Sequence, residues 1–206
     1  RQEGDYWDSF ANFSFDLDKR NQKFQTTDGY RSLYYLNVPF VSDTNTLKNT
    51  YNYKYFAELY EENITTFSVY LSAANSLSND NVKLSERLNV PSDKLRGFEF
   101  GKVGPKDGAD FIGGNYVSTL NLSSTLPNFL ENAQNTDFLF FIDAANIWGV
   151  DYDSSIDNSN QIRSSIGLGL DWFTPVGPLS FSISQPLTKA ASDQTESFRF
   201  NLGTSF

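Results

Sequence analysis

The chain has 206 residues, with 16 Lys and Arg against 25 Asp and Glu, so its formal net charge is −9. It contains no His and no Cys, which excludes His- or Cys-based nucleophilic catalysis, Cys/His zinc sites and disulfide frameworks. The acidic balance argues against nucleic acid as a partner, because neutralising phosphates requires clustered Lys and Arg. Because Met is also absent, we expect that the chain does not begin at a translation start and that upstream sequence exists.

Apolar and polar residues alternate along most of the chain, which predicts an all-β protein. Between Ile162 and Trp172 the even positions are almost all apolar, whereas the odd positions carry Arg, Ser, Gly or Asp. Most of the segments with strand character are longer than the roughly five or six residues of a typical soluble strand. In chain order, about nine such segments lie near 7–17, 29–39, 49–61, 64–76, 113–126, 136–148, 162–173, 178–187 and 197–206.

Strands with one apolar and one polar face fit two architectures. In a soluble sandwich the apolar faces form a core, whereas in an outer-membrane barrel they meet lipid and the polar faces line the lumen. Long strands, tight connections at 61–63 and 173–177, and long polar connections at 77–112 and 149–161 favour an antiparallel up-and-down transmembrane β-barrel. No linker or repeat divides the chain, so residues 1–206 are predicted to form one barrel region.

The connection at 77–112 is too long for a simple turn, and a loop of that length usually has a function or packing of its own. It contains Leu95-Arg96-Gly97-Phe98, followed by Gly104-Pro105-Lys106. These two stretches resemble the loop signature of the BamA family of outer-membrane assembly factors. In the order that the family has them, 140–148 resembles a strand with an inward Asp, 170–187 a late hairpin, and 198–206 the terminal strand.

The resemblance implies a fold and an activity. Family members have a 16-stranded barrel preceded by periplasmic POTRA repeats, so the chain is expected to hold about the last nine strands and no POTRA repeat. Loop 77–112 is then an extracellular loop. The implied function is the folding and insertion of other β-barrel proteins into the bacterial outer membrane. The implied partners are the lipid bilayer, unfolded β-barrel substrates and periplasmic lipoprotein subunits, without enzymatic chemistry, metal or cofactor.

The resemblance also implies a clasp inside the barrel, where the Arg of the family's loop bonds acidic residues on the inner wall. Arg96 matches that Arg, and Asp143 matches one acidic partner. Alternation supports the second assignment, because Phe140 and Ile142 pointing outward direct Asp143 into the lumen. Asn121 stands where the family has a second carboxylate, so the clasp is expected to have one charged partner and one neutral partner. The implied clasp residues are Leu95, Arg96, Gly97, Phe98, Asn121 and Asp143.

The terminal strand carries an apolar row predicted to face lipid, formed by Phe198, Phe200, Leu202 and Phe206. In the family this strand is a targeting signal and forms one side of a lateral seam, and Gly203 matches the position where the strand kinks inward. A weakly paired edge is normally a hazard, because its free N–H and C=O groups template another strand. For an insertase, the same edge would pair with an incoming strand.

Three alternatives remain at this stage. The first is the autotransporter-assembly paralogue of the same superfamily. The Gln185-Pro186 pair after the late hairpin favours the BamA family over this paralogue. The second is a passive small barrel that acts as a pore, adhesin or anchor, which would have no reason to carry Leu95–Phe98 opposite Asp143. The third is a soluble β-sandwich binding module. Separately, Asp151–Asp157 has alternating acids but lacks the Gly and Glu of a calcium loop, so a solvated exterior loop is expected.

Overall fold

The computed structural model describes residues 7–60, 63–126, 135–156, 161–174 and 177–202. The described residues form strands and three short 3-10 turns. The strands are β1 (Asp8–Asp18), β2 (Gly29–Ser42), β3 (Thr46–Tyr60), β4 (Asn63–Ser76), β5 (Lys106–Asp107), β6 (Asp110–Phe111), β7 (Tyr116–Thr125), β8 (Thr136–Trp148), β9 (Arg163–Thr174), β10 (Gly177–Thr188) and β11 (Phe198–Leu202). The 3-10 turns are η1 (Leu84–Glu86), η2 (Ser92–Lys94) and η3 (Ser154–Ile156).

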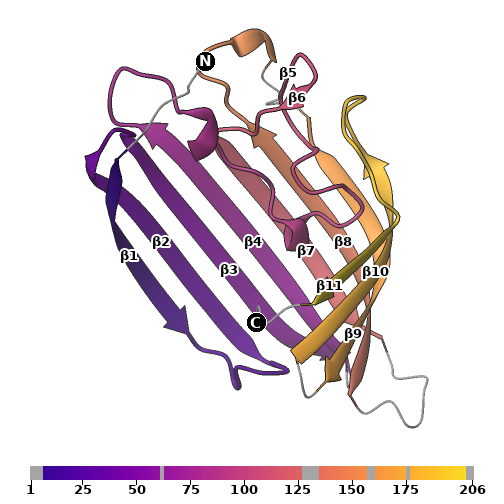
Figure 1. Cartoon of the computed structure of the whole chain (residues 1–206). Coiled ribbons are helices and arrows are strands. Elements are labelled where there is room, and N and C mark those ends of the chain that lie inside the picture. The colour runs from indigo at the N-terminus through magenta and orange to yellow at the C-terminus, as the bar shows by residue number, and fades with distance from the viewer. Residues whose placement is uncertain (1–6, 61–62, 127–134, 157–160, 175–176, 203–206) are drawn as a thin grey trace.

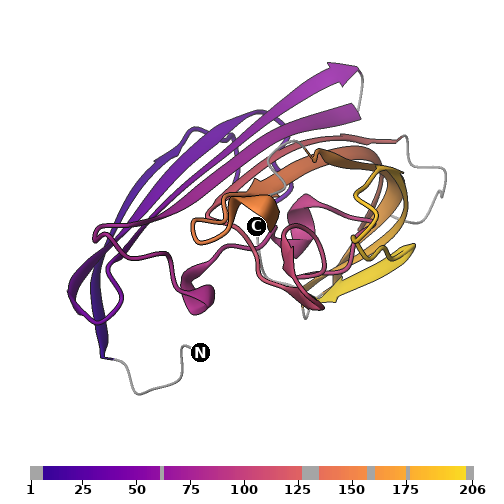
Figure 2. The same ribbon diagram turned by 90° about the horizontal axis from the view of Figure 1, so that it is seen from above.

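Nine of these strands form one antiparallel sheet in the order β1-β2-β3-β4-β7-β8-β9-β10-β11 (Figure 1), and β5 and β6 form a separate small hairpin. Apart from β4 and β7, between which the β5–β6 hairpin lies, neighbours in the sheet are consecutive strands of the chain, which confirms the predicted all-β, up-and-down arrangement. Seen from above, the sheet curls into a trough with the long loop inside it (Figure 2). Among the described residues, β1 and β11 are not paired with each other.

The predicted bounds are approximate, and several differ from the described strands by up to three residues. The segment expected to begin at residue 113 enters the sheet only at Tyr116, because Gly114 pairs with Leu88 and so belongs to the loop. The residues at 203–206, which include Gly203 and Phe206, lie outside the described residues. The described part of the chain contains no helix whose length and hydropathy would let it cross a membrane.

The register assigns each side chain to one face of the sheet, because directly opposed residues in an antiparallel pair share a face. The outer face is apolar and uncovered: Phe15 and Ile183 are each 66% exposed and Leu168 is 57% exposed. In a sandwich these rows would be buried against a second sheet. Their exposure over the whole width of the sheet therefore contradicts the soluble-sandwich alternative and is the pattern of a lipid-facing barrel wall.

The buried core lies on the opposite, inner side of the sheet. It joins residues of the long loop to residues of β7 and β8, and it consists of Val90, Leu95, Phe98, Val103, Val117, Ala145 and Ile147. The core therefore fixes the loop to the inner wall of the trough. Polar and charged side chains surround this core on the same face, among them Asn121, Asp143, Arg163 and Arg199.

Candidate functional site

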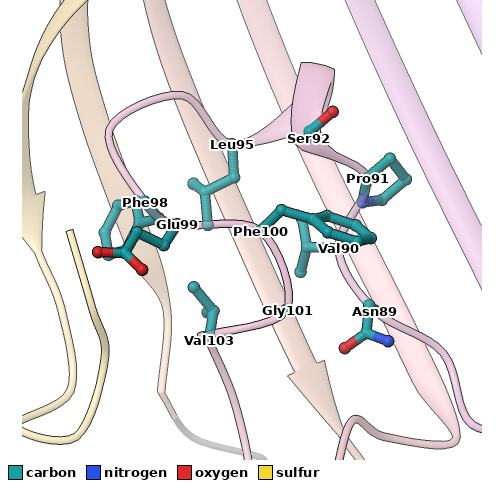
Figure 3. A pocket seen from close by; sticks show the side chains of 10 residues that line it. All are labelled: Asn89, Val90, Pro91, Ser92, Leu95, Phe98, Glu99, Phe100, Gly101 and Val103. Atoms are coloured by element: carbon teal, nitrogen blue, oxygen red, sulfur yellow. The ribbon is translucent and has the colours of Figure 1, made fainter. Parts of the chain in front are cut away.

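The segment between β4 and β7, residues 77–115, is called the clasp loop below. Its two arms pack on each other as well as on the wall. Figure 3 shows Leu95 and Val103 pointing toward each other from opposite arms. The space they enclose is only about 10 Å³, which leaves room for at most one water molecule. Leu95 and Phe98 are 3% and 2% exposed. The loop is therefore a packed element that presents the backbone of Arg96 and Gly97 to the wall.

Arg96 and Asp143 are brought together inside the trough. The Arg96 Nε and Nη2 atoms donate to the Asp143 Oδ2 and Oδ1 atoms, each over 2.8 Å, and the Arg96 backbone N–H donates to Oδ2 over 3.1 Å. Such a bidentate pair fixes the geometry as well as the charge. The guanidinium also lies 3.4 Å from the centroid of the Phe141 ring, which adds a cation–π contact. Asp143 is fully buried, so the loop is its source of positive charge.

Asn121 acts as the neutral partner of this pair. Its Nδ2 donates to the Asp143 Oδ1 over 2.9 Å and to the Lys94 carbonyl over 2.7 Å, so one amide links the wall carboxylate to the loop backbone. Thr119 donates to the amide oxygen and orients the group. Asp143 thus accepts from Arg96 three times and from Asn121 once, which satisfies a carboxylate that would otherwise be costly to bury.

Two glycines allow the approach of loop and wall. Gly97 has a φ of +93°, and a Cβ there would lie 3.2 Å from the Ser184 hydroxyl and 3.3 Å from the Ser165 Cβ, so a side chain would push the loop off β9 and β10. The Ser165 hydroxyl donates to the Arg96 carbonyl in the space that remains. Gly167 of β9 leaves room for the Phe141 ring that lies under Arg96.

A second buried ion pair escaped the sequence analysis. The Arg163 Nε and Nη2 atoms donate to the two carboxylate oxygens of Asp193 over 2.9 and 3.2 Å, and neither side chain is exposed. The Gly104 N–H also donates to Asp193, so the β10–β11 connection is tied both to the wall and to the clasp loop. Arg163 stands at an inward position of β9, and that alternation was the available signal, but nothing local marked Asp193 as its partner.

The first residue of the loop expected to be solvated, Asp151–Asp157, is exposed as expected, and it also bonds to the clasp loop. Arg87 of the clasp loop, buried at its side chain, pairs with Asp151, and the Val82 N–H and the Asn115 amide donate to the same carboxylate. Burial raises the pKa of the Asp151 carboxyl, but these three donors outweigh it and hold the pKa below its ordinary value. The outer end of the clasp loop is therefore anchored by a third ion pair.

The terminal strand presents its apolar row outward, as the alternation indicated. Phe198, Phe200 and Leu202 are exposed, and the Phe200 ring lies 5.0 Å from the ring of Phe181. Among the described strands, β11 pairs only with β10 and β1 only with β2, so these two strands form the edges of the described sheet. The structure thus places a short edge strand beside a loop that is fixed inside the trough.

These features define a class of protein: an outer-membrane β-barrel wall with an internal loop held by buried ion pairs. The whole chain, residues 1–206, matches the Omp85 superfamily domain. The chain belongs to the Omp85 superfamily, and its location is the outer membrane.

Similar proteins agree with this assignment. A protein of Neisseria meningitidis serogroup B named outer membrane protein assembly factor BamA is 28% identical over 139 residues, which cover 54% of this chain and 17% of that protein. A protein of the same name from Neorickettsia risticii is 24% identical over 169 residues, covering 80% of this chain and 22% of that protein. The crystal structure of BamA from Haemophilus ducreyi lacking POTRA domains 1-3 has a TM-score of 0.84 at 25% identity, covering 92% of this chain and 41% of that chain. The chain spans less than a quarter of the length of these two curated relatives.

Proposed function

We propose that this chain is the C-terminal part of a barrel that folds and inserts other β-barrel proteins into the outer membrane. The similar proteins named above are assembly factors, and their name supports this activity for the present chain. The proposed substrates are unfolded β-barrel proteins, and the proposed partners are the bilayer and periplasmic lipoprotein subunits. No catalytic group or cofactor is required, because the free energy comes from the folding of the substrate.

The observation that carries the proposal is the combination of a fixed inner loop with a terminal strand that pairs with β10 over only five described residues. A strand that enters the membrane must satisfy its backbone N–H and C=O groups, since hydrocarbon offers no partners. The edge of β11 supplies such partners by strand addition. The clasp of Arg96, Asp143 and Asn121 keeps the neighbouring wall rigid while the edge changes partners. A passive pore or anchor gains nothing from this arrangement.

The test is a folding assay in lipid vesicles. The complete gene product is reconstituted, an unfolded outer-membrane barrel is added, and the appearance of the folded form is followed by its altered gel migration without heating. We expect folding to be faster than in empty vesicles and in vesicles that hold an unrelated small barrel. Equal rates in all three would contradict the proposal.

Two variants make the assay specific. Arg96→Ala removes the clasp and is expected to slow substrate folding, whereas Arg31→Ala removes a half-exposed ion pair with Asp16 and is expected to leave the rate unchanged. The barrel of each variant is checked for its own heat-modifiable migration, so that loss of activity is separated from loss of the fold. If the two variants behave alike, the clasp has no part in the activity.

A further inference from the structure

The connection between β10 and β11, residues 189–197, does not extend the sheet. It pairs with the clasp loop, where Phe98 and Thr195 form an antiparallel bridge. The Glu99 N–H donates to the Gln194 carbonyl over 3.0 Å, and the Glu196 N–H donates to the Gly97 carbonyl over 3.2 Å. The residues just ahead of the terminal strand are therefore a strand of the loop rather than of the wall.

This diversion shortens the last pairing of the sheet. β10 has 12 residues, whereas the described part of the terminal strand, β11, has five. On the side of the β10–β11 connection, the ladder ends with the Ser184 N–H donating to the Ser197 carbonyl. If the ladder continued in register, Pro186 would stand opposite Thr195. The alternation of hydrogen-bonded pairs directs the backbone nitrogen of residue 186 toward β11, as it does that of Ser184.

Proline has no N–H, so it cannot make that contact. The β10–β11 ladder therefore lacks a hydrogen-bond donor at residue 186, the next position after Ser184 that faces β11. Thr195 instead turns inward and forms a bridge with Phe98. Pro186 keeps its place in β10 opposite Ser165 of β9, where its missing donor costs nothing because its nitrogen faces away from β9. One proline thus ends the last ladder without disturbing the previous one.

Asp193 holds the diverted segment in place. Its carboxylate joins Arg163 of the wall, the Gly104 N–H of the clasp loop and the Ala190 N–H of the connection itself. Arg199, an inward side chain of β11, donates to the carbonyls of Ser92 and Phe98. The loop is consequently bonded to the first part of the terminal strand and to the segment that precedes it.

We propose that Asp193 and Pro186 are positioning residues for the terminal strand: Asp193 holds residues 193–197 on the clasp loop, and Pro186 denies them the alternative place on β10. The length over which β11 pairs with β10, and hence the ease of exchanging partners at this edge, is set by the clasp loop. The part of this inference that concerns partner exchange rests on the proposed function. The part that concerns the pairing of residues 193–197 rests on the geometry alone.

The experiment measures amide hydrogen exchange in the complete gene product in detergent micelles, for Asp193→Asn, Pro186→Ala and the double variant. The present ladder uses the amides of Glu99, Gln194 and Glu196, whereas a ladder on β10 would use those of residues 186 and 195. In the double variant we expect protection to be lost at the first set and gained at residue 195, and the new amide at residue 186, which the wild type lacks, should also be protected. A purely structural role for Asp193 would lower protection without producing this gain.

The matched controls are Asp153→Asn and Pro39→Ala. Asp153 has an exposed carboxylate that, among the described residues, bonds Ser155 of its own turn, and Pro39→Ala introduces an amide N–H in β2. Both controls keep Pro186, which has no amide hydrogen to exchange, and neither should alter exchange at residues 193–197. If the double variant keeps the exchange pattern of the wild type, or loses protection at both sets, the proposal is wrong.

A reversible bond links the pairing to activity. The chain has no Cys, so Glu99→Cys with Gln194→Cys, which stand opposite each other beside the Phe98–Thr195 bridge, introduces a single disulfide. Oxidation should leave the rate of substrate folding unchanged, because the segment already lies on the loop while the short edge exchanges partners, whereas the Asp193→Asn, Pro186→Ala double variant should slow substrate folding several-fold. Slower substrate folding by the oxidised form would overturn the coupling. If the wild type does not speed substrate folding, the proposed function is wrong, but the hydrogen-exchange experiment still tests the pairing of residues 193–197.

Discussion

Two halves of the inner wall differ in what covers their charged side chains. On β1 and β2, Arg31 and Asp16 form an ion pair of 2.8 Å whose side chains are 30% and 40% exposed. On β8, Asp143 forms a pair of the same length with Arg96, but its own exposure is zero because the clasp loop covers it. The strands of both halves follow the same alternation. The difference shows that the loop, rather than the strand pattern, decides which polar contacts of the wall matter energetically.

The largest expected effect comes from breaking a covered pair. Asp143→Ala leaves the Arg96 guanidinium and the Asn121 amide without their acceptor, and breaking such a buried pair costs about 3–5 kcal/mol. Asp16→Ala, its counterpart in the uncovered half, should cost no more than about 1 kcal/mol. Urea unfolding of the two variants in detergent, followed by heat-modifiable migration, measures both.

Adding Arg96→Ala to Asp143→Ala sharpens the result. The double variant should be clearly less destabilised than the sum of the single variants, because each single change already removes the same contact. Additive effects, or equal losses for Asp143→Ala and Asp16→Ala, would remove the distinction between the two halves.

A charged residue on the outer face should have the next largest effect, and the loss of stability should be the same in both halves of the wall. Ile183 and Phe15 are each 66% exposed on the outer face, one beside the clasp and one far from it in the sheet. Lys at either position meets lipid, and the cost near the bilayer midplane is about 2–4 kcal/mol. Ile183→Lys and Phe15→Lys should therefore be destabilised alike in the unfolding measurement. Tolerance of Phe15→Lys alone would show that the uncovered half does not face lipid.

The sequence predicted what depends on local alternation. It placed nine strands, the outward apolar rows and the inward direction of Asp143, because each of these follows from the two-residue period of a strand. The clasp could not be predicted from alternation alone. Alternation gives the direction of the Asp143 side chain, whereas its contact with Arg96 was expected only from the resemblance to the family. Alternation contains no information on which loop residue returns to the wall.

The contacts that escaped prediction join distant residues of irregular backbone. Arg163 and Asp193 are 30 residues apart, and Arg87 and Asp151 are 64 apart, each with one partner in a connection whose path no periodicity describes. The early entry expected at residue 113 failed for the same reason, since Gly114 pairs with Leu88 of the loop. Loop path is set by packing over long sequence separations, so it follows from the folded structure and not from the pattern.

A smaller effect is expected where loop and wall meet through a missing side chain. A Cβ at Gly167 would lie 2.4 Å from the Phe141 ring and from the Ile183 carbonyl, so Gly167→Ala must displace the ring that lies under Arg96. Overpacking of this kind costs about 1–3 kcal/mol. Ser14→Thr, which adds one methyl group to the exposed inner face of β1, should change the unfolding free energy by less than about 0.5 kcal/mol. Similar values for both would mean that the covered wall is loosely packed.

The smallest effect concerns the outer anchor of the clasp loop and depends on pH. The folded-state pKa of Asp151 lies below the value of about 3.9 that an unfolded Asp has, so the stabilisation is present above that value and is lost as pH falls through the lowered folded pKa. Arg87 stays charged throughout, and its partner becomes neutral. We expect amide exchange at Val82, whose N–H donates to Asp151, to accelerate on acidification below about pH 4, after correction for intrinsic exchange. Asp151→Asn should abolish the pH dependence of exchange at Val82. Exchange of the Arg96 amide should be the same in this variant as in the wild type, because the Arg96 amide donates to the fully buried Asp143 and not to Asp151. A loop that loosens at both ends together on acidification would show that the outer anchor and the clasp open as one unit.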